Sequence, residues 1–222
     1  MKKFESILLF SGGVDSFIAY HYLHQPQTLY FNVQSRYSKK ELSVVQSLIP
    51  SSIIDNSLNF SDKEFGENAY IPFRNLLLAA QAVKYADTIY IAGIKDDMVS
   101  DKNEQVFLKM SILLSELEGH AIQILSPFWN MTKNNIISWF LKNIGTEIEL
   151  LKTISCYSSD DTLYCGACPA CFRKWCAFRS NGIDLPFYSE ELLNRYYSKA
   201  LNNYYIPERN ETIIREIDAY RS

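Results

Sequence analysis

Short apolar segments alternate with longer amphipathic segments along the first two thirds of the chain. Each apolar run is brief and bounded by turn-forming residues, which is the pattern of a buried parallel strand. The runs lie at about residues 5–10, 28–33, 51–55, 88–93 and 121–126. Helical patterns occupy the stretches between them. This alternation predicts an α/β fold with a doubly wound parallel sheet, in which ligands bind above the carboxyl ends of the strands.

Two of the intervening helices have clear start signals. Pro72 suits a first helical turn, and apolar residues follow it at helical spacing. Thr132 is a candidate N-cap of another helix, which Gly145 would end. Further helices are expected at about residues 171–180, 188–202 and 211–220. We therefore expect one compact domain, with a nucleotide-binding core at 1–150 and a helical elaboration at 151–222.

The first apolar run leads into a loop of small residues, Ser11-Gly12-Gly13-Val14-Asp15-Ser16, and then into an apolar helical segment. Small side chains let the backbone N–H groups turn toward a ligand, and the following helix adds its positive N-terminal dipole. The loop therefore predicts a nucleotide-phosphate site. It has neither a Walker A ending nor a dinucleotide fingerprint, which argues against γ-phosphate transfer and NAD. The alternative is a glycine-rich turn without a ligand.

Four of the five cysteines lie close together near the other end of the chain: Cys156, Cys165, Cys168 and Cys171. Thiolates at this spacing can bind one tetrahedral ion at about 2.3 Å each, in a closed and therefore structural site. We expect zinc, with an iron–sulfur cluster as the competing assignment. A disulfide is disfavoured, because the N-terminus lacks a secretory pattern and we expect a cytoplasmic chain with reduced thiols. Cys176 is expected to be a buried helical cysteine.

The composition narrows the classes of partner. Of the 222 residues, 47% are hydrophobic, which is ample for a packed core, and no apolar run is long enough to span a membrane. The formal net charge of −3 argues against stable nucleic-acid binding, which depends on clustered Lys and Arg. The largest basic group is Arg36, Lys39 and Lys40. It is expected to be a solvated helix start or, at Arg36, a contact to nucleotide phosphates.

Together these motifs resemble the PP-loop ATP pyrophosphatases and, among them, the QueC-type 7-cyano-7-deazaguanine synthases of the queuosine pathway. The resemblance covers most of the chain and rests on the phosphate loop, the cysteine cluster and the segments 72–75, 93–97, 127–128 and 132–133. It implies a Rossmann-like five-stranded sheet of order 3-2-1-4-5, zinc on the four cysteines, and a homodimer. The implied reaction is the conversion of 7-carboxy-7-deazaguanine and ammonia to the nitrile, with ATP and Mg²⁺.

The implied chemistry assigns roles to the phosphate side of the site. The substrate carboxylate attacks the α-phosphate of ATP, ammonia displaces AMP, and a second adenylation of the amide allows the nitrile to form. Catalysis then rests on positioning and on stabilisation of phosphate charge. Residues 11–16, including Ser16, hold the pyrophosphate, and Asp15 coordinates Mg²⁺ or fixes the loop. Lys133 neutralises phosphate charge, unless it is a solvated first-turn residue, and Arg74 orients substrate or ATP, unless it forms a surface ion pair.

The same resemblance suggests a substrate wall. Asn75 is expected beside Arg74, and Asp97 or Asp101 is expected to hydrogen-bond the amino-pyrimidinone edge of the guanine-like base. The heterocycle would stack on an aromatic ring, Phe128 or Trp129. A ring edge that is read by hydrogen bonds gives sharp selection, because an analogue without the donor leaves buried groups unpaired.

Two segments depart from the family pattern where substrate would be read. Residues 32–37 lack the family's glycine and histidine after the second strand, and residues 99–107 replace its segment after the fourth strand. Three functions therefore stay open. The first is the nitrile synthase. The second is a relative that transfers the activated deazaguanine to another amine, such as a protein amine in antiviral defence. The third is a nucleotide-binding partner protein without turnover.

Overall fold

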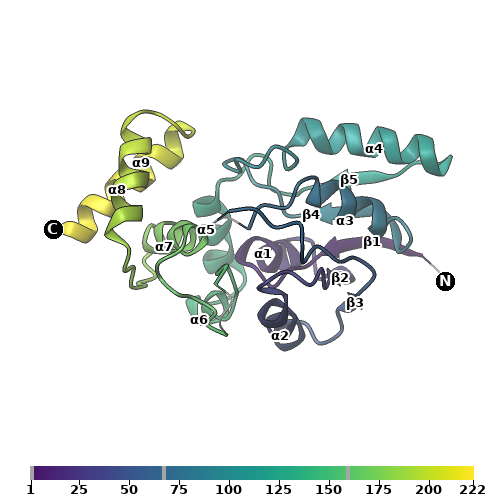
Figure 1. Cartoon of the computed structure of the whole chain (residues 1–222), viewed down its shortest axis with the longest axis horizontal. Coiled ribbons are helices and arrows are strands. Elements are labelled where there is room, and N and C mark those ends of the chain that lie inside the picture. The colour runs from purple at the N-terminus through teal and green to yellow at the C-terminus, as the bar shows by residue number, and fades with distance from the viewer. Residues whose placement is uncertain (1–2, 67–68, 159–160) are drawn as a thin grey trace.

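The protein, described here from a computed structural model at residues 3–66, 69–158 and 161–222, is built around a five-stranded parallel sheet (Figure 1). Its strands are β1 (Phe4–Leu9), β2 (Thr28–Phe31), β3 (Ile53–Asp55), β4 (Ala86–Ile91) and β5 (Gln123–Leu125). Each overlaps one of the predicted apolar runs. The strands lie in the order β3-β2-β1-β4-β5 and pair in parallel throughout, which confirms the predicted fold class and strand order.

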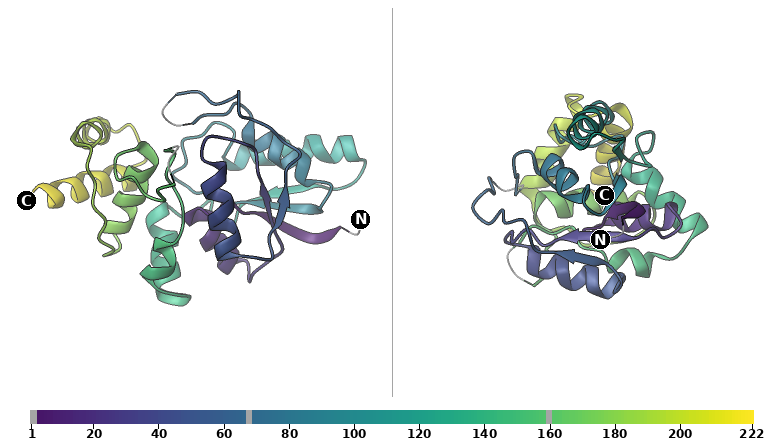
Figure 2. Two further views of the ribbon diagram at one scale, coloured as in Figure 1. Left: turned by 60° about the horizontal axis from the view of Figure 1, so that its bottom comes forward. Right: turned by 90° about the vertical axis from the view of Figure 1, so that its right-hand side faces the viewer.

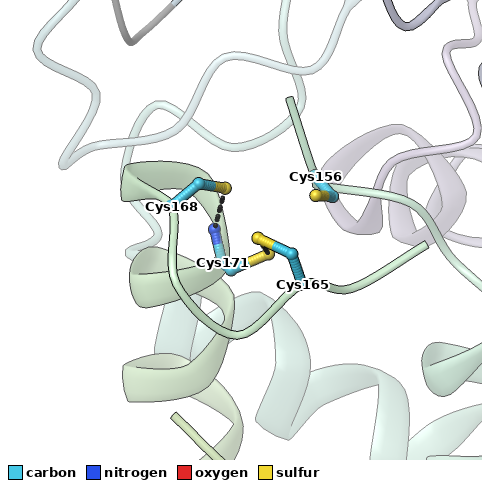
Figure 3. A group of neighbouring side chains, drawn as sticks. All are labelled: Cys156, Cys165, Cys168 and Cys171. Carbon is cyan, nitrogen blue, oxygen red and sulfur yellow. Dashed lines mark hydrogen bonds between the residues drawn. The ribbon is translucent and has the colours of Figure 1, made fainter. Parts of the chain in front are cut away.

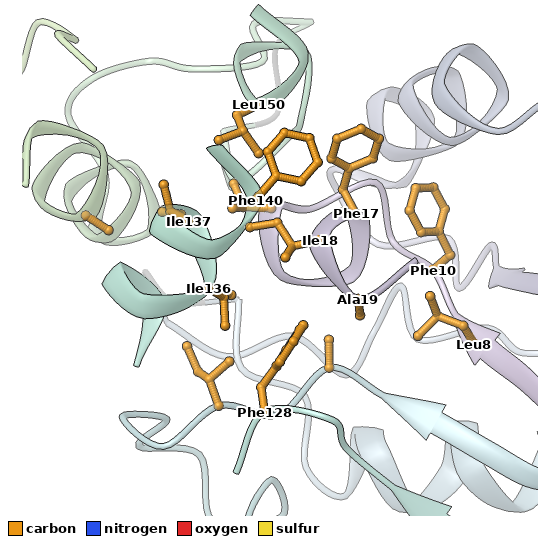
Figure 4. Packing of buried hydrophobic residues seen from close by; sticks show 14 of the residues in the cluster. Leu8, Phe10, Phe17, Ile18, Ala19, Phe128, Ile136, Ile137, Phe140 and Leu150 are labelled. Carbon is orange, nitrogen blue, oxygen red and sulfur yellow. The ribbon is translucent and has the colours of Figure 1, made fainter. Parts of the chain in front are cut away.

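Helices cover both faces of the sheet, because successive side chains of a strand point to opposite faces. These helices are α1 (Val14–Tyr22), α2 (Ser38–Leu48), α3 (Arg74–Ala82), α4 (Glu104–Glu118) and α5 (Lys133–Asn143). Ile7 of β1 packs in a buried cluster with α3 and α4, whereas its neighbour Leu8 packs in a second cluster with α1, α2 and α5. Figure 4 shows this second cluster, in which Phe17 and Phe140 meet between α1 and α5. Each such buried side chain contributes about 1.5–3 kcal/mol, so the two clusters hold the layers together.

The helix boundaries agree with the local signals, with one exception. Thr132 caps α5 as predicted, since its side chain accepts a hydrogen bond from the backbone of Asn135. The helix ends at Asn143, two residues before the predicted stop at Gly145. Pro72 does not begin α3. The helix starts at Arg74 instead, because Phe73 has a left-handed backbone with φ 56°, which cannot continue into a right-handed turn.

The C-terminal part lies beyond the end of the sheet at which the carboxyl ends of the strands point (Figures 1 and 2). It contains the short α6 (Glu147–Leu151), α7 (Pro169–Arg179), α8 (Glu190–Leu201) and α9 (Pro207–Arg221). The last three helices confirm the predicted ones, and the predicted buried cysteine, Cys176, lies within α7. A third hydrophobic cluster around Phe172 and Trp175 packs these helices together. The boundary at residue 150 stays a prediction.

Among the described residues, no helix has the length and hydropathy needed to cross a membrane.

Candidate active site

A cavity of about 290 Å³ lies above the carboxyl ends of β1, β2 and β4, next to the point where the strand order reverses. This is the position at which doubly wound sheets bind ligands. Its walls come from the phosphate loop, α2, α3, the loop after β4, the start of α5 and α7, and residues 154–157. Segments far apart in the sequence therefore converge on one site.

The phosphate loop has the geometry of an anion receptor. Gly12 has φ +71°, and a Cβ atom added there would lie 2.9 Å from Cγ1 of Val44, so the turn requires glycine. The hydroxyl of Ser16 donates to the carbonyl oxygen of Gly13 (3.1 Å) and accepts from the N–H of Ser11 (3.3 Å), which fixes the loop. Among the described residues, none accepts a hydrogen bond from the N–H groups of the first three residues of α1, Val14, Asp15 and Ser16. These groups face the helix end where an anion is favoured.

Lys133 and Asp15 form an ion pair at the cavity wall. The Nζ of Lys133 donates to Oδ1 of Asp15 at 2.7 Å, and the backbone N–H of Lys133 donates to Oδ1 of Asp96 at 3.0 Å. Burial lowers the pKa of Lys133, and the negative charge of Asp15 opposes that shift. The start of α5 therefore places a partly desolvated cation directly beside the phosphate loop, and the roles expected for Lys133 and Asp15 at the nucleotide phosphates stay predictions.

Arg74 and Asn75 both line the cavity from the first turn of α3. Arg74 donates from Nη1 to the hydroxyl of Tyr37 at 3.2 Å. Asn75 donates from its backbone and from Nδ2 to the carboxylate of Asp101, at 3.0 and 2.8 Å. Asp101 does not itself line the cavity but lies in a separate groove between α3 and α4. Asp101 therefore holds Asn75 in place and does not contact the cavity.

Asp97 is a cavity residue whose carboxylate is already paired. It forms ion pairs with Lys102 at 3.0 Å and with Arg173 at 2.8 Å, and it accepts the N–H of Ile94 at 3.1 Å. Burial alone would raise its pKa, but the charges of Lys102 and Arg173 hold the pKa of Asp97 below its usual range. Both cations also line the cavity. Sequence reasoning missed them because Arg173 lies in the region of the cysteine cluster and carries no local motif.

The predicted aromatic stacking residues lie elsewhere, which corrects that expectation. Phe128 is completely buried in the core on the α1 and α5 face, where its ring meets Tyr22 at a centroid distance of 5.0 Å. Trp129 packs against Phe107, with ring centroids 4.9 Å apart. Neither ring lines the cavity. The aromatic ring of Phe128 packs in the core. The sequence pattern alone does not distinguish an aromatic residue that packs in the core from one that stacks on a ligand.

Other aromatic rings line the cavity. Tyr37 and Tyr157 lie with ring centroids 5.4 Å apart, and both line it together with Tyr30 and the carboxyl group of Glu41. These four residues were not predicted. Arg36, predicted to contact phosphate, instead forms an ion pair with Glu64 at 3.3 Å and does not line the cavity.

The four clustered cysteines converge as predicted (Figure 3). Their sulfur atoms all lie within 4.8 Å of one another, and those of Cys165 and Cys171 are 3.8 Å apart. A tetrahedral zinc site with bonds of about 2.3 Å has sulfur–sulfur edges of about 3.8 Å. Backbone N–H groups of Ala167 and Cys171 point at two of the sulfurs, at 3.4 Å each, as in a site that holds thiolates. The four residues therefore fit a single tetrahedral ion such as zinc.

The cysteine cluster is connected to the phosphate loop through the backbone. The N–H of Ile154 donates to the carbonyl oxygen of Gly12 at 3.0 Å, and Ile154 pairs with Gly13 in a parallel bridge. Cys156 follows two residues later and itself lines the cavity. The strand-like segment that carries the first cysteine is therefore also a wall of the cavity.

Comparison with known proteins places the chain in a family. The family model described as "Queuosine biosynthesis protein QueC" matches residues 32–182, which is more than half of the chain. A 7-cyano-7-deazaguanine synthase from Rickettsia prowazekii is 32% identical over 232 aligned residues, which cover 84% of this chain and 98% of the relative. A protein of the same name from Psychromonas ingrahamii is 25% identical over 219 residues, covering 83% and 97%. This chain belongs to the QueC family.

Proposed function

We propose that this protein uses ATP to convert 7-carboxy-7-deazaguanine and ammonia to 7-cyano-7-deazaguanine. The observation that carries the proposal is the convergence, in one cavity, of a phosphate-receptive loop, the buried cation of Lys133 and a wall of aromatic rings. The names of the relatives support this reaction class. A site of this kind can hold the phosphates of a nucleotide beside a planar heterocycle.

The phosphate loop and its neighbours would hold ATP. The N–H groups of the first turn of α1 and the hydroxyl of Ser11 would bind phosphate oxygens, with Ser16 fixing the loop. Lys133 would offset the negative charge that accumulates on the pyrophosphate leaving group. Asp15 keeps that lysine charged and in place, and it is the residue that would hold the Mg²⁺ ion carried by ATP, which supplies further charge neutralisation.

The reaction needs two activations of the same carbon. In the first, a carboxylate oxygen bonds to the α-phosphorus of ATP as the bond to pyrophosphate breaks, and ammonia then displaces AMP to give the amide. In the second, the amide oxygen attacks another ATP, and loss of AMP and two protons leaves the nitrile. None of these steps needs a covalent bond to the enzyme, so the residues of the cavity act by positioning and by electrostatic stabilisation.

The test is a turnover assay with purified protein, ATP, ammonia and 7-carboxy-7-deazaguanine, followed by mass spectrometry. We expect one nitrile for each pair of AMP molecules, together with pyrophosphate. ADP as the main nucleotide product, or AMP release that the heterocycle does not stimulate, would contradict the proposal. A protein that binds ATP without releasing AMP would instead be a nucleotide-binding partner.

A second candidate function follows from the two segments that depart from the family pattern. Val33 and Tyr37 from the first segment, and Val99 and Lys102 from the second, all line the cavity. The altered residues therefore lie where an acceptor would approach. Transfer of the activated deazaguanine to another amine, such as a protein amine, is favoured if the heterocycle stimulates AMP release but excess ammonia yields no nitrile.

A further inference from the structure

The cavity has two chemically different sides, separated by the phosphate loop. In the part of the chain that the structure describes, the side toward β4 and β5 carries three cations: Lys133, which is the proposed phosphate contact, and the two partners of Asp97, Lys102 and Arg173. The side toward β2 is lined by the rings of Tyr30, Tyr37 and Tyr157 and by the carboxyl group of Glu41. Because β1 lies between β2 and β4 in the sheet, a ligand that fills the cavity crosses from one kind of surface to the other.

Glu41 differs from the other two acidic residues of the cavity in how its carboxyl group is paired. Asp15 and Asp97 each form an ion pair at 3.0 Å or less. Glu41, in the first turn of α2, accepts a hydrogen bond on Oε2 from the hydroxyl of Tyr30 at 3.1 Å. Among the described residues, none hydrogen-bonds its other oxygen, Oε1, and none forms an ion pair with it. The group therefore retains capacity to accept hydrogen bonds at the cavity.

The surroundings of Glu41 reinforce this difference. Burial raises the pKa of Glu41 to about 7, although the positive charge of Arg74 opposes the shift. Arg74 is directed to the hydroxyl of Tyr37 at 3.2 Å, so it does not satisfy the carboxyl group by a direct hydrogen bond. A partly buried acceptor of this kind gains from a ligand that brings its own N–H donors.

The amino-pyrimidinone ring of a 7-deazaguanine offers such donors. Its ring N–H and its exocyclic amino group lie side by side in one plane and can both donate to one carboxylate, as base edges do to acidic side chains in nucleic-acid recognition. Adenine has a single amino group on the corresponding edge, next to an acceptor nitrogen, so it matches a carboxylate less well. The rings of Tyr37 and Tyr157 supply flat apolar surface for the heterocycle.

We propose that Glu41, held by Tyr30, is the residue that reads the amino-pyrimidinone edge of the substrate. The assignment replaces Asp97, whose carboxylate is held by Lys102 and Arg173, and Asp101, which lies outside the cavity. It rests on the proposed function, since it takes a 7-deazaguanine as the substrate. Glu41 is thus a specificity residue that contacts the heterocycle, at a distance from the groups that handle the phosphates.

The test measures binding of two ligands, ATP and 7-carboxy-7-deazaguanine, to wild type and to Glu41→Gln by isothermal titration calorimetry. The substitution keeps the size of the side chain but replaces an acceptor by a donor, so we expect the Kd of the heterocycle to rise about 10- to 100-fold. The Kd of ATP should change by less than about twofold. Tyr30→Phe, which frees the carboxyl group, should weaken heterocycle binding by a few-fold only.

The matched control is Glu64→Gln. Glu64 lies outside the cavity, yet its charge acts on Glu41, so this variant tests for a general electrostatic effect. It should bind both ligands like wild type. An analogue of the substrate without the exocyclic amino group keeps the ring N–H donor, so it should bind wild type about tenfold more weakly, and its Kd should differ less between wild type and Glu41→Gln than the Kd of the substrate does.

The outcomes separate the alternatives. If Glu41→Gln weakens ATP binding but not heterocycle binding, the carboxyl group contacts adenine. If the substitution changes the binding of neither ligand, Glu41 has no role in ligand binding. Either result overturns the inference. If wild type does not bind 7-carboxy-7-deazaguanine, the proposed function fails, and free guanine becomes the probe. Guanine binding that is weakened by Glu41→Gln would then support the inference that Glu41 recognises the amino-pyrimidinone edge. Guanine binding that does not depend on Glu41 would overturn this inference as well.

Discussion

Removal of the metal from the four-cysteine site should weaken nucleotide binding as well as stability. The perturbation is Cys168→Ser, or chelation of the purified protein. Cys156 lies two residues after Ile154, whose N–H holds the carbonyl oxygen of Gly12 in the phosphate loop at 3.0 Å. A metal bound to Cys156 therefore restrains a segment that also restrains the loop. In the metal-free protein, ATP binding must therefore order both the segment of Ile154 and the phosphate loop, which costs binding free energy.

The size of the effect follows from the contacts that join the two sites. The hydrogen bond between Ile154 and Gly12 is worth about 0.5–1.5 kcal/mol net. If the metal-free segment no longer makes it, the Kd of ATP should rise about 2- to 12-fold, since 1.4 kcal/mol corresponds to about a factor of ten. A larger loss is not expected, because Lys174 still holds the preceding residue, Thr153, through its carbonyl oxygen at 2.6 Å.

The assay is ATP titration by calorimetry, below the melting temperature of the variant, with circular dichroism to show that the fold persists. Cys176→Ser is the matched control, because Cys176 lies in the same helix, α7, but outside the cluster. It should keep about one metal ion per chain and bind ATP like wild type. Folded, metal-free protein that binds ATP with wild-type affinity would refute the coupling between the cysteine site and the loop.

Two further predictions concern the charged side of the cavity. Lys133→Met should lower AMP-forming turnover by about 100-fold or more at saturating ATP, as rate measurements against wild type would show, because it removes the cation beside the leaving pyrophosphate; wild-type rates would argue that Lys133 has no catalytic role. Asp97→Asn should destabilise the fold by about 3–5 kcal/mol in denaturant titrations, because Lys102 and Arg173 lose their partner. The pKa of Asp97 is depressed in the folded state, so its contribution is present above the unfolded pKa of about 4 and is lost as the pH falls through the folded pKa. The difference between wild type and Asp97→Asn should therefore shrink in acid, and a difference that is independent of pH would contradict this reasoning.

Local signals made the framework predictable. Apolar runs identified the five strands because buried parallel strands need them on both faces, and the small residues of the phosphate loop are required by its turn. The four cysteines were recognisable since ligands that are close in sequence reach one ion without help from the rest of the fold. Thr132 was recognisable because a cap is decided within one helical turn.

The substrate wall was not predictable to the same degree, because it is assembled from distant segments. Arg173 reaches Asp97 only when α7 packs at the end of the sheet, and Tyr157 meets Tyr37 across more than half of the chain. Phe128 shows the opposite problem. An aromatic residue that follows a strand can either stack on a ligand or pack in the core, and Phe128 is completely buried in the core.

The strand order determines how the two halves of the proposed reaction meet. β1 carries the phosphate loop and lies between β2, beside Glu41 and the tyrosines, and β4, beside the paired cations. A heterocycle that is held on the β2 side by its polar edge directs its opposite, carboxylate-bearing side toward the loop. In the proposed complex the carboxylate would then face the α-phosphate of a nucleotide whose pyrophosphate would lie beside Lys133. Attack at that phosphorus would then need no movement of the sheet, so in the proposed reaction positioning would supply much of the rate enhancement.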